Sequence, residues 1–114
     1  MFNKTSSVCA ALLAAVAPAS AEIGVGRPAS CLLHVKGHEA IRGECEFTPT
    51  NRDGSFIISS YNGKYFAYVI ITQKGVADGY WNGSPYASHA HNPLGKLYRE
   101  DGCWVNNLAS VCAY

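Results

Sequence analysis

Histidine and serine gather in one short stretch of the chain, where they could bind or transform a partner. One residue separates His89 from His91, and Ser88 directly precedes the first of them. On a strand, residues two apart point to the same side, so two imidazoles could ligate one metal ion. A serine beside a histidine could also form a nucleophile and its base. The stretch therefore raises three possibilities, which are a metal site, a hydrolase and a polar binding loop.

The sequence favours a polar binding loop over the other two. No Cys, Asp or Glu is obviously free to complete a metal site with His89 and His91, although metal binding through the histidines stays open as an alternative. The Gly-x-Ser-x-Gly pattern of a nucleophile elbow does not occur. A chain this short also leaves little room for a catalytic pocket. We therefore expect no enzyme activity, no cofactor and no resident metal.

Residues 83–93 predict the loop that would meet a partner. The stretch holds glycine, two prolines, serines and histidines without clean alternation, which is typical of a long loop. The preceding run 79–86 sets Tyr and Trp beside Gly, Ser and Asn, a composition common in contact surfaces. A predicted hairpin turn at Asn62-Gly63 could add a cation from the neighbouring lysine. The residues expected to contact the partner are Ser84, Tyr86, Ser88, His89, His91 and Lys64.

Short runs rich in β-branched and aromatic residues alternate with turn residues, which predicts strands to hold this loop. We expect an all-β fold, a small antiparallel barrel or sandwich of seven to eight short strands, because helical periodicity is poor throughout. The predicted strands span 30–35, 40–47, 55–60, 65–72, 76–82, 94–99, 103–105 and 110–113, after an extended lead-in at 22–29.

Cysteine spacing predicts two disulfides. A hairpin turning around residues 37–39 would place Cys31 opposite Cys45, and one turning around 106–109 would place Cys103 opposite Cys112. Cys9 falls in the predicted signal peptide, which leaves four of the five cysteines. Four cysteines allow three connectivities, and this strand geometry favours Cys31–Cys45 with Cys103–Cys112. The pattern suits a small exported domain.

The N-terminus reads as a secretory signal peptide. A charged start with Lys4 precedes an apolar stretch at 8–19 and small residues at 19–21, so cleavage would leave residues 22–114 as a single β-domain. The apolar stretch is too short to span a bilayer, and no later stretch is longer, so we expect a chain that is not membrane-embedded.

Because residues 22–114 hold eight basic and eight acidic residues, no nucleic-acid partner is expected. The expected location is periplasmic or secreted.

Several segments resemble those of small periplasmic proteins of alphaproteobacteria. In size, export, cysteines and all-β character the chain also resembles the periplasmic inhibitors of c-type lysozyme, β-barrels that block the lysozyme cleft with a protruding loop. The inhibitors' Ser-Gly-x-x-Tyr stretch has a partial counterpart in 60–65. The resemblance implies a protein partner, and the most specific candidate is c-type lysozyme. The alternative is a structural envelope protein that binds peptidoglycan through Tyr and Trp faces. The segments carrying the first resemblance are Gly79–Gly83, Ala87–His91, Leu94-Gly95, Gly102–Asn106 and Val111–Ala113.

Overall fold

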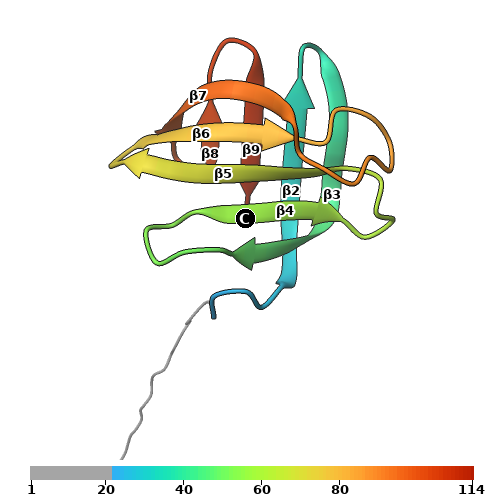
Figure 1. The fold of residues 1–114 in the computed structure, drawn as a ribbon, viewed down its shortest axis with the longest axis horizontal. Helices are drawn as coiled ribbons and strands as arrows, with labels where there is room; N and C mark the ends of the chain where they lie inside the picture. Colours follow the sequence, from blue (N-terminus) through green and yellow to red (C-terminus); the bar gives the residue numbers. More distant parts are fainter. Residues whose placement is uncertain (1–21) are drawn as a thin grey trace, which may run out of the picture.

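Eight antiparallel strands pair in sequence order, and the last pairs with the first, so the sheet closes into a barrel (Figure 1). The computed structural model describes residues 22–114, and the predicted signal peptide at 1–21 lies outside the described residues. The all-β prediction is confirmed. Of the two architectures expected, barrel and sandwich, the structure is a barrel. The strands are β2 (Arg27–Val35), β3 (His38–Pro49), β4 (Phe56–Ser60), β5 (Phe66–Gln73), β6 (Val76–Trp81), β7 (Asn92–Glu100), β8 (Cys103–Val105) and β9 (Ala109–Ala113).

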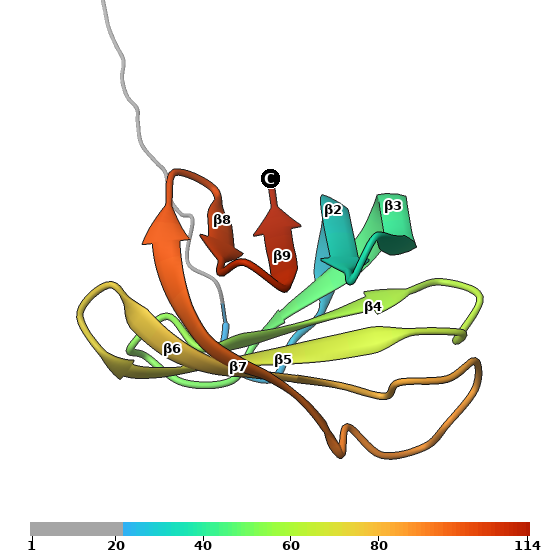
Figure 2. The same ribbon diagram turned by 90° about the horizontal axis from the view of Figure 1, so that it is seen from above.

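The barrel is flattened into two crossed layers. β4, β5 and β6 run across the direction of β2, β8 and β9, and β3 and β7 bend from one layer into the other (Figures 1 and 2). Each bending strand carries a glycine at positive φ, Gly43 at 106° in β3 and Gly95 at 88° in β7. Glycine adopts this conformation without a steric penalty, so these two positions permit the bends. Among the described residues no helix is long and apolar enough to cross a membrane.

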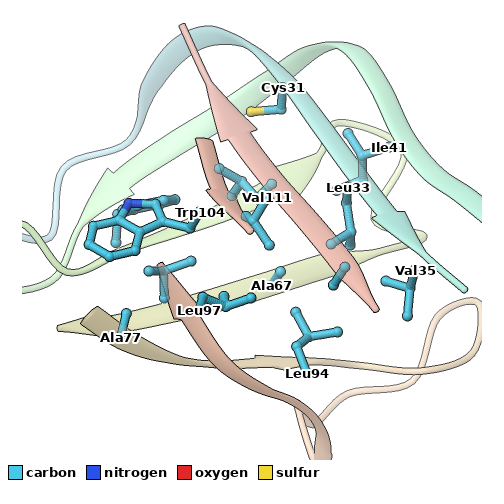
Figure 3. Close-up of a cluster of buried hydrophobic side chains, with 14 of the residues drawn as sticks. Cys31, Leu33, Val35, Ile41, Ala67, Ala77, Leu94, Leu97, Trp104 and Val111 are labelled. Carbon is cyan, nitrogen blue, oxygen red and sulfur yellow. The ribbon is translucent and has the colours of Figure 1, made fainter. Parts of the chain in front are cut away.

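Inward-facing side chains of both layers form one core (Figure 3). Beside Val69, the inner face of β5 and β6 carries three small buried residues, Ala67, Ala77 and Gly79. A Cβ at Gly79 would lie 2.5 Å from the Cδ1 of Leu97 and 3.1 Å from the Cβ of Leu94. Because both leucines are almost fully buried, neither has space to retreat, so this small face is what lets them fill the barrel.

Both predicted disulfides are present, Cys31–Cys45 and Cys103–Cys112. Two disulfides are consistent with an oxidising, exported environment. Cys103 lies directly opposite Cys112, as predicted. The predicted register of the first hairpin is wrong, because Cys31 lies opposite Gly43 and reaches Cys45 diagonally, with the Cα atoms 5.8 Å apart.

The register differs because the turn between β2 and β3 is tighter than the sequence suggests. Lys36 and Gly37 form it alone, with φ values of 51° and 78°. Two consecutive residues at positive φ are the signature of the two-residue hairpin turn that matches strand twist. Lysine is not a usual residue at a positive φ, and the sequence therefore predicts the turn one to two residues further along the chain.

Candidate binding surface

Up-and-down topology sends every second connection to the same end of the barrel. The connections that follow β2, β4, β6 and β8 are residues 36–37, 61–65, 82–91 and 106–108. We call this end the loop end. All six predicted partner-binding residues lie in two of these connections, and all six are exposed. The connection at 82–91 lies beside the β4–β5 turn in both views of the ribbon (Figures 1 and 2).

Asn82 anchors the long β6–β7 loop. It is only 3% exposed, and its side-chain amide nitrogen lies within hydrogen-bond distance of the carbonyl oxygens of Lys64 (3.0 Å), Ser84 (3.2 Å) and Ala87 (3.2 Å). Its Oδ1 accepts a hydrogen bond from the backbone amide of Phe66 at 3.2 Å. One buried side chain thus supplies hydrogen-bond partners to backbone groups of both the loop and the β4–β5 turn. These groups lie beyond the ends of the strands, where no neighbouring strand can pair with them.

Tyr86 occupies a strained backbone position at the centre of the loop. Its φ is 65°, and its side chain is 67% exposed. Its backbone amide donates to the carbonyl of Lys64 at 2.9 Å, so this carbonyl receives hydrogen bonds from both Tyr86 and Asn82. A left-handed conformation costs a residue with a side chain about 1–2 kcal/mol. The surrounding hydrogen bonds therefore hold an aromatic ring out into solvent at an energetic cost.

Contacts tie the connections of the loop end to one another and to the neighbouring strands. The Tyr65 ring stacks on Trp81, with centroids 5.8 Å apart, and meets the edge of His38 at 5.9 Å. On the other side, the Lys36 amide donates to the Leu108 carbonyl at 2.9 Å. The Asn106 side chain joins the β8–β9 connection to β7 by donating to the carbonyl oxygens of residues 94 and 96, both at 2.9 Å. Tyr65 and Trp81 also cover the apolar core at this end of the barrel.

The two loop histidines lie together. The rings of His89 and His91 stack with centroids 5.0 Å apart and planes 7° from parallel. Ser88 makes no hydrogen bond to either ring within residues 22–114. In the same residues no three His, Cys, Asp or Glu side chains lie close enough to hold a metal ion. The loop therefore exposes the Ser88 hydroxyl and a stacked pair of imidazoles to solvent.

The four connections of the loop end carry basic side chains and no acidic ones. None of the four connections contains Asp or Glu, whereas they contain Lys36, Lys64 and two histidines. Glu39, at the start of β3, pairs with Arg42 at 2.7 Å. The hydrogen bond from Arg42 lowers the pKa of the Glu39 carboxyl, so this acid is ionised and already engaged with a cation. The loop end therefore offers lysine ammonium groups and uncharged hydrogen-bonding groups to an acidic partner.

The sequence predicted the exposed residues of this surface but not those that hold it in place. Asn82 precedes Gly83, which reads as an ordinary turn signal, and its hydrogen bonds reach residues up to 18 positions away. Nothing local distinguishes a buried anchoring asparagine from an exposed turn asparagine. The sequence predicts a hairpin turn around residues 37–39, and only barrel closure shows that this turn lies at the same end as the long loop.

Comparison of the chain with protein-family models, curated proteins and solved structures finds no match.

Replacing Asn82 with alanine should loosen the β6–β7 loop. The change leaves the Phe66 amide without its partner and removes the side-chain contacts to three carbonyls, of which that of Lys64 keeps the Tyr86 amide. We therefore expect the free energy of unfolding to fall by about 1–3 kcal/mol. Amide hydrogen exchange at Phe66 and Tyr86 should accelerate more than at Val69 in the core. Asn107→Ala, at an exposed asparagine in the β8–β9 connection, is the matched control and should change neither quantity. Equal exchange at Tyr86 in N82A and the unmodified protein would contradict the anchoring role.

Proposed function

We propose that this protein is an exported, non-catalytic binding module that grips an acidic protein surface with its loop end, in the periplasm or outside the cell. The observation that carries the proposal is Tyr86, an exposed ring held at φ 65° by hydrogen bonds to the neighbouring turn. Strain of this kind persists only where the surroundings impose it, and it gathers at functional sites. Exposed tyrosine supplies rigid contact area at a small entropic cost.

The charge of the loop end indicates the chemistry of the partner. Lys36 and Lys64 stand in connections that contain no carboxylate of their own. Their ammonium groups would attract a surface rich in Asp and Glu and speed its approach. Ser84, Ser88 and the two histidines can donate hydrogen bonds to carboxylates, and a bond to a charged group is stronger than one between neutral groups.

The cleft of a c-type lysozyme is the most specific partner of this chemistry. Such a cleft holds one protonated and one ionised carboxyl group. A rigid loop that offers both hydroxyl and imidazole groups can meet the two protonation states with different hydrogen bonds. The resemblance of the chain to periplasmic lysozyme inhibitors, in its size, disulfides and barrel form, supports the same choice.

Peptidoglycan remains the second candidate because of one feature of the outer barrel surface. Tyr68 lies directly opposite Tyr80, and Ile57 and Pro93 continue this row on the neighbouring strands. Both tyrosines are half-buried, so part of each ring is open to solvent. Tyrosine rings on adjacent strands could stack on sugar rings.

The change Tyr86→Gly separates binding from folding. Glycine adopts positive φ without strain, although it also gains freedom in the unfolded chain, so the free energy of unfolding should stay unchanged or rise by up to about 1 kcal/mol. Loss of the ring should weaken lysozyme binding by roughly tenfold or more, as at an aromatic hot spot. Tyr86→Phe keeps the ring and should retain most of the affinity. Calorimetric titration together with thermal unfolding measures both quantities, and unchanged affinity in Y86G would remove Tyr86 from the interface.

The double change Ser88→Ala, His89→Ala should weaken lysozyme inhibition by at least roughly tenfold while the fold stays intact, because a hydroxyl and an imidazole donor are lost from exposed positions. Inhibition is measured as a slower loss of turbidity when lysozyme acts on a cell-wall suspension. The control is Thr72→Ala, Gln73→Ala, which removes two exposed side chains at the far end of β5. Full inhibition by the double variant would discard this part of the site. If the unmodified protein fails to bind lysozyme but sediments with peptidoglycan, the second candidate replaces the first.

A further inference from the structure

The barrel is covered at the loop end and hollow at the other. At the opposite end, the turns β3–β4, β5–β6 and β7–β8 surround a pocket of about 320 Å³. Each turn contributes a glycine to the wall, Gly54, Gly75 and Gly102. At Gly54 and Gly75 no atom lies within 3.5 Å of where a side chain would begin, so these two positions leave the mouth open. Stacked Tyr65 and Trp81 cover the core at the loop end, whereas the stacked pair at this end, Phe47 and Phe56, lines an open pocket.

The floor of the pocket is aromatic and reaches the core. Phe56 and Trp104 are 5% and 6% exposed, and both belong to the buried cluster. Trp104 lies at one edge of that cluster, on the side away from Val35 (Figure 3). Phe47 lines the same pocket and stacks on Phe56, with centroids 5.0 Å apart. Such a floor favours a flat or flexible apolar group over a polar one.

The rim of the pocket carries two cations and one carboxylate. Lys74 and Arg99 are both exposed, and neither forms an ion pair within residues 22–114. Arg99 is held over the pocket, because its Nε donates to the Asp101 carbonyl at 2.9 Å and its guanidinium carbon lies 5.8 Å from the Trp104 ring centroid. Asp53 is engaged with Ser55, whose hydroxyl and backbone hydrogen bonds lower the pKa of the Asp53 carboxyl.

From this arrangement we propose that the pocket binds a small organic anion, a carboxylate attached to a compact apolar body. The apolar body would lie on Phe56 and Trp104, and the carboxylate would meet Lys74 and Arg99. A guanidinium presents paired donors that match a carboxylate. The volume is at the low end of the ~300–1,000 Å³ typical of ligand pockets, which limits the occupant to a small molecule. This site is independent of the loop end and of the partner bound there.

Binding of decanoate and of 3-phenylpropanoate tests the proposal with an aliphatic and an aromatic body. The chain has two tryptophans, so Trp81→Phe makes Trp104 the sole indole reporter. Saturable change of Trp104 fluorescence is expected with either acid, and at least roughly tenfold weaker binding is expected in Lys74→Gln, Arg99→Gln. The control Lys36→Gln, Lys64→Gln removes equal charge at the loop end and should leave the affinity unchanged. Asp53→Asn should tighten binding, because it removes the one negative charge of the rim.

Three results would overturn the proposal. The first is no binding of either acid at millimolar concentration by the unmodified protein, measured by calorimetry. The second is equal binding of decanol and decanoate, which would show an apolar hollow without anion recognition. The third is equal binding of acetate, which would show a surface charge effect without a pocket. None of these results bears on lysozyme binding, so the proposal for the pocket and the proposal for the loop end are tested independently.

Discussion

The pairing of β2 with β9 closes the sheet, and this closure sets the position of everything else. Each of the two strands that must meet is joined covalently to its other neighbour, β2 to β3 by Cys31–Cys45 and β9 to β8 by Cys103–Cys112. Each disulfide therefore lowers the conformational entropy of the unfolded chain within one of the two hairpins that must meet, so less entropy is lost when those hairpins form. A small domain with a modest core gains most from such restraints. Closure also removes the unpaired edges that an open sheet would expose.

Closure divides the surface into two ends of different character. The connections after β2, β4, β6 and β8 share one end, where Asn82 holds the longest of them against the β4–β5 turn. The shorter turns share the other end, where glycines leave the mouth open above Trp104. One end is therefore suited to a macromolecular surface and the other to a small molecule. The strain at Tyr86 and the open mouth both depend on the same rigid barrel.

Local patterns in the sequence were enough to predict the strands, because β-branched runs and turn residues are short-range signals. The exposed loop residues were predictable for the same reason. The register of the first hairpin was not, because it depends on two residues at positive φ, one of them a lysine. Asn82 and the hollow above Trp104 arise from segments far apart in the chain. Such features follow from closure, which no local pattern encodes.

The central claim is that the loop end is where the partner docks, and mapping the contact on the protein tests it most directly. Backbone amide resonances followed during titration with a c-type lysozyme would report every contacted segment at once. The account predicts shifts concentrated in residues 61–65 and 82–91, with residues 53–54 and 74–75 unchanged. Shifts confined to the outer face of β5 and β6 or to the glycine-lined mouth, or no shifts at saturating lysozyme, would contradict it.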